Sequence, residues 1–216
     1  ALGYVQSQER YESQQEILDT VAEFKKRDIP LSLIVLDWLS WEDGMWGQKS
    51  FDKKRFPDVP TMVEKLHEEN VHFMISIWPT MNEKSENYKE MKEAGTLLSG
   101  VNICNAFDEA GRKLYWSQAK RGLADLGVES WWCDSSEPLT PEWNHIEKPL
   151  PENIFHEYLQ TTSDIMPPQK ANAYGLYHAR GMFEGQTRDF PDRPVLTLTR
   201  SGYPGSQRYG VTLWSG

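Results

Sequence analysis

The sequence has little that would point to a membrane protein, a nucleic-acid binder or a redox protein. Its 216 residues include two cysteines, Cys104 and Cys133, which exclude a disulfide framework and a CxxC metal motif. Acidic side chains outnumber basic ones by 32 to 23, so clustered cations for phosphates, and nucleic acid as a partner, are not expected. No apolar run approaches the roughly 20 residues of a membrane helix, so no membrane association is predicted. The cellular compartment and the oligomeric state stay open.

Metal and phosphate motifs are equally scarce. Nothing resembles HExxH, and the spacing of five between His67 and His72 would turn them to different faces of one helix. No glycine-rich phosphate loop follows any of the apolar runs. We therefore predict neither a metal site nor a cofactor.

What the sequence does have is an alternation of helical and β-rich segments. Ser13 and Glu16 form a capping box before apolar residues at helical spacing, which predicts a helix that ends near Arg27. Two further helices are predicted near residues 60–69 and 108–126. Apolar runs bounded by turn signals predict strands. With 3–6 counted as the first, the six predicted strands are residues 3–6, 32–38, 72–78, 128–134, 194–200 and 210–214.

This alternation indicates an α/β fold with a parallel sheet, either doubly wound or a (β/α)8 barrel. A barrel gathers its site from the carboxyl ends of several strands, and five polar or aromatic residues stand there in this sequence. They are Asp37, Trp78, Asp134, Arg200 and Trp214. Since a barrel needs eight strands and about 250 residues, we predict an incomplete (β/α)8 TIM barrel over residues 1–216, with six strands present. A smaller open α/β sheet is the alternative.

The segment WWCDSSEP at residues 131–138 is the richest in chemistry. It places Asp134 and Glu137 beside two indoles at a strand end. Indole rings stack on the apolar faces of sugars, and a carboxylate at the anomeric carbon can stabilise or attack an oxocarbenium-like centre. On these residues alone, a purely structural interpretation has equal weight with sugar chemistry. In that interpretation the two tryptophans are buried, and Asp134 and Glu137 cap the next helix.

Five segments together resemble the catalytic domain of glycoside hydrolase family 31. In chain order they are IVLDW (34–38), ISIWP (75–79), WWCDSSEP (131–138), TRS (199–201) and LWSG (213–216). Two more, QSQERY (6–11) and FDKKRFPD (51–58), are similar to the α-xylosidase-like members. The resemblance covers nearly the whole chain.

The resemblance implies a retaining glycosidase with Asp134 as its catalytic nucleophile and Glu137 as a support for the nucleophile loop. Arg200 is expected to contact the sugar and to favour the ionised form of Asp134. The expected sugar-binding set is Asp37, Trp38, Trp78, Trp132, Arg200 and Trp214. In the family an aspartate that serves as general acid/base directly follows the tryptophan–x–glycine segment. It would therefore come after Gly216, so a chain that ended there would be an inactive, C-terminally truncated piece.

The implied partner is an oligosaccharide or polysaccharide with a terminal α-linked sugar. α-Xylosidase is slightly favoured over α-glucosidase, with α-N-acetylgalactosaminidase or glucosyl transfer as alternatives within the family. A non-catalytic carbohydrate-binding protein is the alternative outside it. Either packing or a place in the +1 subsite is expected for Trp41, Trp46 and Trp143. Arg208 is expected either to contact substrate or to brace its loop. Cys133 is expected to be a small buried side chain that fills space in the core.

Overall fold

The structure, a computed structural model, describes residues 3–137 and 150–215. Six parallel strands form one sheet, in the spatial order of the sequence. They are β1 (Val5–Ser7), β2 (Leu33–Leu36), β3 (His72–Ile77), β4 (Ser130–Cys133), β5 (Leu196–Thr199) and β6 (Val211–Leu213). All six predicted strands are confirmed, and most are shorter than the apolar runs that predicted them.

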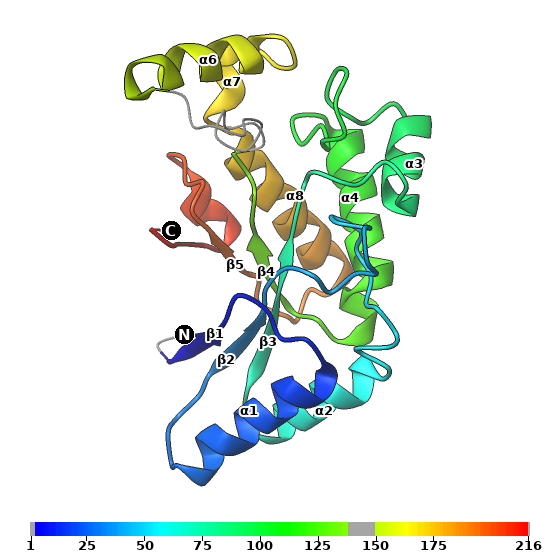
Figure 1. The fold of residues 1–216 in the computed structure, drawn as a ribbon, viewed down its shortest axis with the longest axis vertical. Coiled ribbons are helices and arrows are strands. Elements are labelled where there is room, and N and C mark those ends of the chain that lie inside the picture. The colour runs from blue at the N-terminus through cyan, green and yellow to red at the C-terminus, as the bar shows by residue number, and fades with distance from the viewer. Residues whose placement is uncertain (1–2, 138–149, 216) are drawn as a thin grey trace.

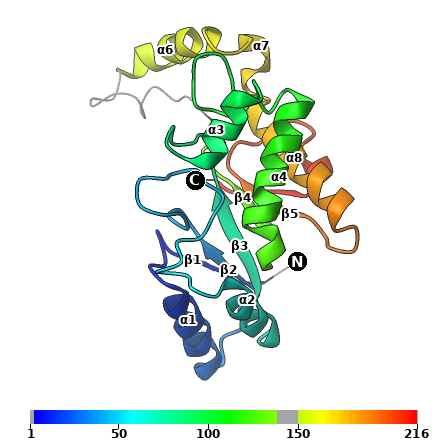
Figure 2. The same ribbon diagram turned by 90° about the vertical axis from the view of Figure 1, so that its right-hand side faces the viewer.

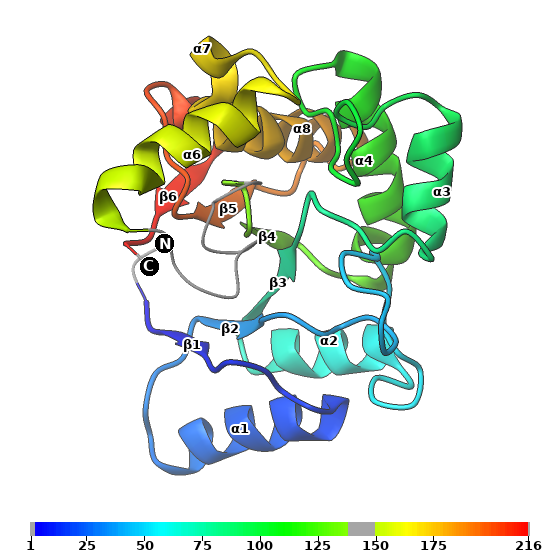
Figure 3. The same ribbon diagram turned by 45° about the horizontal axis from the view of Figure 1, so that its top comes forward.

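The sequential strand order separates the two predicted architectures. A doubly wound sheet reverses its order at a switch point, whereas a (β/α)8 barrel adds each strand beside the previous one. The sheet is also curved, so that its edge strands β1 and β6 both lie at the left of Figure 3 with β3 and β4 opposite. The six strands form part of a (β/α)8 barrel, as predicted.

The helices follow the strands along the chain. They are α1 (Gln14–Lys26), α2 (Val59–Glu68), α3 (Glu86–Glu93), α4 (Glu109–Gly122), α6 (Pro151–Ser163), α7 (Pro168–Ala171) and α8 (Tyr174–Asp189), with short 3-10 helices η1 (Ala124–Leu126) and η2 (Ser206–Tyr209). Figures 1 and 2 show α6 and α7 beyond the carboxyl ends of the strands, opposite α1 and α2. Among the described residues, no helix is long and apolar enough to cross a membrane.

The capping residues explain where the predicted helices begin. Ser13 accepts a hydrogen bond from the backbone N–H of Glu16 (3.2 Å), and the Glu16 carboxylate accepts one from the N–H of Glu12 (2.7 Å). The capping box is therefore present, with its return bond one residue earlier than expected. Asp58 and Asp108 cap α2 and α4 in the same way. The helix predicted over 108–126 is interrupted, since α4 ends at Gly122 and η1 follows.

Side chains alternate between the two faces of the sheet. On the outer face, Phe73, Ile75 and Trp131 belong to the main hydrophobic core, which α1, α2, α4 and α8 cover. On the inner face, Met74 and Trp132 belong to a smaller cluster of residues from β2 to β5. This period of two is the pattern of a barrel wall. It sends the two adjacent indoles at 131 and 132 to opposite sides.

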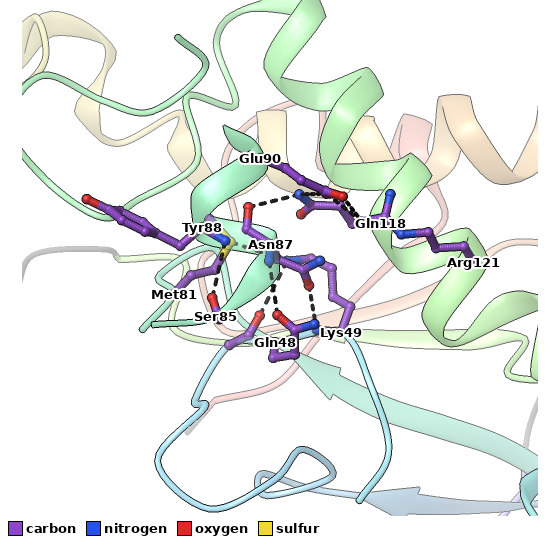
Figure 4. Close-up of polar contacts among 10 residues, drawn as sticks. Gln48, Lys49, Met81, Ser85, Asn87, Tyr88, Glu90, Gln118 and Arg121 are labelled. Atoms are coloured by element: carbon purple, nitrogen blue, oxygen red, sulfur yellow. Dashed lines mark hydrogen bonds and ion pairs between the residues drawn. The ribbon is translucent and has the colours of Figure 1, made fainter. Parts of the chain in front are cut away.

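A buried polar network anchors the loop between β2 and α2 to the next two helices (Figure 4). The backbone N–H of Lys49 donates to Oδ1 of Asn87 (2.7 Å), and Asn87 N–H donates to Oε1 of Gln48 (3.1 Å). Gln118 on α4 donates to the Asn87 carbonyl (3.0 Å) and to Glu90 (2.9 Å). These bonds fix the loop over residues 39–50, which carries two of the tryptophans.

Candidate active site

The five residues predicted at strand ends all lie at the carboxyl edge of the sheet. Asp134 follows β4, and its backbone N–H donates to the carbonyl of Ile77 on β3 (3.1 Å). Its Oδ2 accepts a hydrogen bond from the indole Nε1 of Trp78 (3.2 Å). Asp37 follows β2 and interacts electrostatically with Asp134. The barrel thus positions a carboxylate between neighbouring strand ends, where a ligand can reach it.

Asp134 is a half-buried carboxylate whose surroundings act on its pKa in both directions. Burial raises its pKa, the backbone N–H of Ser135 and the charge of Arg200 lower it, and Glu137 raises it. The net pKa lies above the ordinary value. Arg200 acts in the predicted direction, but burial outweighs it. Ser135 adopts φ of +52°, a strained backbone for a residue with a side chain, and its N–H is directed to the carboxylate.

Asp37 is the second carboxylate of the site, and it is strongly perturbed. Burial raises its pKa to about 6, with smaller upward contributions from the charges of Asp134 and Glu9. The backbone N–H of Trp38 donates to its Oδ1 (2.7 Å) and partly offsets this effect. Two acids with different environments at one strand edge are typical of acid, base or binding roles at a reacting centre.

Aromatic rings line the site on the β2 and β3 side. Trp38 and Trp78 are stacked with ring centroids 6.4 Å apart, and Trp41 meets Trp78 edge-on at 5.2 Å. The guanidinium of Arg10 lies 5.2 Å from the Trp38 ring. Trp41 is 2% exposed, which assigns it to packing rather than to a subsite surface.

A separate pair of indoles stands on the β4 to β6 side. Trp132 and Trp214 are edge-to-face with ring centroids 4.9 Å apart. Trp132 belongs to the inner-face cluster, and its indole Nε1 has no hydrogen-bond partner within the described part of the chain. Trp214 is 36% exposed and follows β6, and its backbone N–H donates to the Thr199 carbonyl at the end of β5 (3.1 Å).

Glu137 ties the loop after β4 to the loop after β5. It accepts hydrogen bonds from Nε (3.0 Å) and Nη2 (3.5 Å) of Arg200, and the Ser201 hydroxyl donates to its Oε1. Arg200 is thus hydrogen-bonded directly to Glu137, and it acts on Asp134 through its charge. This geometry fits a supporting function for Glu137, which remains a proposal.

Sequence patterns did not indicate one member of the site, His178. It lies buried on α8, and its Nδ1 is 2.8 Å from the hydroxyl of Ser136. That hydroxyl also lies 3.1 Å from the Cys133 carbonyl, to which it donates. Burial lowers the pKa of His178 to about 3, so the ring is neutral. His178 therefore braces the turn that follows Asp134.

The remaining candidates from the sequence are Cys133, Arg208, Trp46 and Trp143. Cys133 is buried on the outer face, and burial raises the pKa of its thiol, as expected for an inert filler. Arg208 lies exposed on η2, and Trp46 is half-buried in the anchored loop. Trp143 and Gly216 lie outside the described residues.

Comparisons with known proteins agree on one family. The model of the family described as "Glycosyl hydrolases family 31 TIM-barrel domain" matches residues 1–216. An α-xylosidase of Saccharolobus solfataricus is 38% identical over 221 residues, covering 100% of this chain and 28% of that protein. An α-glucosidase of Bacillus thermoamyloliquefaciens is 26% identical over 100% of this chain and 28% of its own length.

Solved structures agree with the sequence comparisons. The α-xylosidase of Xanthomonas citri superposes with a TM-score of 0.83 and 32% identity, over 99% of this chain and 24% of that one. An α-xylosidase from a soil metagenome, complexed with xylose, gives 0.80 and 31%, over 99% of this chain and 31% of that one. The chain thus spans about a quarter to a third of the length of these relatives.

Proposed function

Because the chain belongs to glycosyl hydrolase family 31, we propose that it forms the catalytic barrel of a retaining α-glycosidase that uses Asp134 as its nucleophile. The observation that carries the proposal is the position of this carboxylate. It follows β4 at the carboxyl edge of the sheet, accepts a hydrogen bond from the indole of Trp78 and interacts with the charge of Arg200. A carboxylate so oriented can attack an anomeric carbon from one fixed direction.

The proposed reaction is a double displacement. An Oδ of Asp134 bonds to the anomeric carbon as the bond to the leaving oxygen breaks, and a general acid gives that oxygen a proton. Water then attacks the same carbon, the acid's conjugate base takes the water proton, and Asp134 leaves as a free carboxylate. The proposed acid/base is the aspartate that the family resemblance expects directly after Gly216, outside the described residues.

Sugar recognition is assigned to the second carboxylate and the indoles. We propose that Asp37 accepts hydrogen bonds from hydroxyls of the terminal sugar and that Trp38 and Trp78 stack against its apolar face. The opposite wall would be lined by Trp132, Arg200 and Trp214. The substrate would be an oligosaccharide or polysaccharide that ends in an α-linked sugar.

The preferred sugar is proposed to be xylose. The relatives with 38% and 32% identity are both called α-xylosidases, whereas the α-glucosidase named above is 26% identical. The full-length protein should therefore have a higher kcat/KM on aryl α-xyloside than on aryl α-glucoside. The reverse order would assign glucose, and an exclusive preference for aryl α-N-acetylgalactosaminide would assign that class.

The nucleophile is tested by Asp134→Asn in the full-length protein. Loss of a covalent nucleophile should lower kcat on the preferred aryl α-glycoside by about 10^4-fold or more. Asp19→Asn, at an exposed position on α1, makes the same chemical change far from the site and should leave kcat nearly unchanged. Unaltered turnover by Asp134→Asn would contradict the proposal, and sugar binding without turnover by the unsubstituted protein would favour a carbohydrate-binding function.

A further inference from the structure

A second cluster of ligand-forming side chains lies at the end of the strands opposite to Asp134. His67 is in the last turn of α2, His72 is the first residue of β3, and Glu129 immediately precedes β4. The prediction that the two histidines point to different faces of one helix is wrong. α2 ends at Glu68, and Asn70, with φ of +57°, turns the chain into β3. This turn brings both imidazoles to one carboxylate.

The three side chains converge closely. Nε2 of His67 is 3.0 Å and Nδ1 of His72 is 2.8 Å from Oε1 of Glu129, and the imidazole centroids are 6.3 Å apart. The ligand atoms all lie within 4.8 Å of one another. In the described part of the chain, this is the one group of three or more such side chains with this geometry.

These distances are near those of a tetrahedral metal site. With bonds of about 2.0–2.1 Å to nitrogen and 2.0–2.2 Å to oxygen, neighbouring ligand atoms of Zn²⁺ stand about 3.3 Å apart. The nitrogens therefore need to move away from the carboxylate by about 0.3–0.5 Å to admit an ion, and the two nitrogens, which lie within 4.8 Å of each other, need to come to the same spacing of about 3.3 Å. His72 begins β3 and Glu129 directly precedes β4, so the sheet holds both backbones in place.

The surroundings favour a cation. His67 and Glu129 line a cleft of about 750 Å3, whose other charged residues are Glu64, Glu68, Asp125 and Arg193. Excess negative charge around a cleft raises the local concentration of cations. The histidine side chains are 46% and 64% exposed, so an ion and a completing water ligand can enter from solvent.

We propose that His67, His72 and Glu129 form a binding site for a divalent transition metal, with Zn²⁺ as the expected ion. Two neutral imidazoles and one carboxylate suit Zn²⁺ better than Mg²⁺ or Ca²⁺, which prefer oxygen ligands. The ion would join the end of α2 to the beginnings of β3 and β4. At this end of a (β/α)8 barrel such a link stabilises the fold and takes no part in the reaction at the opposite end.

The competing interpretation is a hydrogen-bonded triad without an ion. In that arrangement both imidazoles carry a proton on the nitrogen that faces Glu129 and donate it to the shared oxygen. Metal binding requires those same nitrogens to be unprotonated. The two states therefore exclude one another, and adding zinc distinguishes them.

The test measures zinc in the full-length protein. The chelator-treated protein and its His72→Gln, Glu129→Gln and His156→Gln variants are dialysed against Zn²⁺, and bound zinc is quantified per chain. The unsubstituted protein and His156→Gln should hold one zinc more than the other two variants. His156 is an exposed histidine on α6 and serves as the matched control. Zinc affinity at this site should fall by about 100-fold or more when one ligand is removed.

Measurements on the unsubstituted protein test the proposal even if a variant fails to fold. Co²⁺ added to the unsubstituted protein should give the visible absorption of a four-coordinate ion, and Zn²⁺ should raise Tm whereas Mg²⁺ should not. Equal zinc content in the unsubstituted protein and His72→Gln would overturn the proposal. So would variants that lower Tm to the same extent with and without zinc, because that result describes the hydrogen-bonded triad.

Discussion

The indole Nε1 of Trp78 donates a hydrogen bond of 3.2 Å to Oδ2 of Asp134, and this bond joins the ends of β3 and β4. The Tyr115 hydroxyl on α4 in turn donates to the Trp78 carbonyl (2.9 Å). A helix of the outer layer thus fixes the strand end that orients the proposed nucleophile. The ring of Trp78 is also stacked on Trp38, so one side chain serves both as donor and as wall.

Trp78→Phe should therefore impair catalysis through the carboxylate. The substitution keeps an aromatic wall but removes a donor that lowers the pKa of Asp134. The pKa should rise, less of the carboxylate should be ionised in weak acid, and the acid limb of kcat/KM should move to higher pH. A hydrogen bond to a charged group contributes about 1.5–3 kcal/mol, so kcat/KM at pH 7 should fall by about 10-fold to 100-fold.

Trp41→Phe is the matched control for that experiment. Trp41 is the edge-on neighbour of Trp78, and its indole Nε1 has no hydrogen-bond partner within the described part of the chain. This variant should keep the acid limb in place. An equal shift of the limb in both variants would show that ring volume, and not the hydrogen bond to Asp134, sets the pH profile.

The protonation of Asp37 should also affect the dependence of kcat/KM on pH. With a pKa of about 6, this carboxyl gains a proton as pH falls through 6 and then accepts fewer hydrogen bonds from sugar hydroxyls. We expect kcat/KM to decline below about pH 6, mainly through KM. Because Asp37 and Asp134 interact, their titrations are coupled and the acid limb contains a contribution from each of them.

Two variants of the full-length protein separate the contributions. Asp37→Asn should raise KM strongly, and the part of the limb that belongs to Asp37 should disappear. Glu9→Gln removes an exposed charge that raises the pKa of Asp37, so its limb should move to lower pH with kcat/KM at pH 7 unchanged. A limb that stays in place in Asp37→Asn would contradict this assignment. Rescue of that variant by a glycosyl fluoride would instead assign Asp37 as the proton donor.

The strands and the residues at their ends are predictable from the sequence because both depend on local pattern. A buried parallel strand is a mostly apolar run, and the polar or aromatic residue that ends the run marks its carboxyl end. The pattern alone therefore places Asp37, Trp78 and Asp134 at one edge of the sheet. The distances between them could not be predicted, because they depend on how the strands align.

Helix α8 was missed for a physical reason. Its glycines at 175, 181 and 185 weaken any helical prediction, yet they are needed for close packing. A Cβ on Gly185 would lie 2.1 Å from the Trp116 ring of α4. Without α8, the contact of His178 with Ser136 could not be foreseen. The close approach of the His67 and His72 imidazoles could not be foreseen either. It depends on the turn between these residues and on the carboxylate of Glu129, which lies 57 residues after His72.

Substitutions of Glu137 and of Arg200 should shift the pH profile of kcat/KM in opposite directions. The Arg200 charge lowers the pKa of Asp134 and the Glu137 charge raises it. Arg200→Gln should therefore move the acid limb of kcat/KM to higher pH, and Glu137→Gln should move it to lower pH. Both should reduce kcat, by about 10-fold or more, because each removes hydrogen bonds that link the loops after β4 and β5.

Shifts of the same sign in these two variants would contradict that electrostatic account. They would indicate that both substitutions act by moving the loop that carries Asp134. Ser201→Ala serves as the comparison, since it removes a hydrogen bond to Glu137 without changing charge. It should lower kcat with no displacement of the limb.

The last prediction concerns stability and Lys49, a cation in the interior of the anchored loop (Figure 4). Burial lowers its pKa to about 7, against about 10.4 in an unfolded chain. Between these values the unfolded chain holds a proton that the folded chain has released. The free energy of unfolding should therefore rise as pH increases from about 7 to 10, and below pH 7 the full cost of the buried charge remains.

Lys49→Met should remove this dependence. Its nitrogen lies 3.9 Å from the centroid of the Tyr115 ring, and its hydrogen bonds within the described residues are long ones, to the Gly47 carbonyl (3.4 Å) and to Met81 Sδ (3.7 Å), so methionine loses little. The variant should be more stable at pH 6, on the order of a few kcal/mol, and the advantage should shrink towards pH 10. Tm of the full-length protein and of the exposed control Lys84→Met, measured at pH 6, 8 and 10, provides the comparison. A stability difference between Lys49→Met and the unsubstituted protein that stays constant with pH would contradict the lowered pKa, because it would mean that Lys49 holds its proton equally in the folded and the unfolded chain.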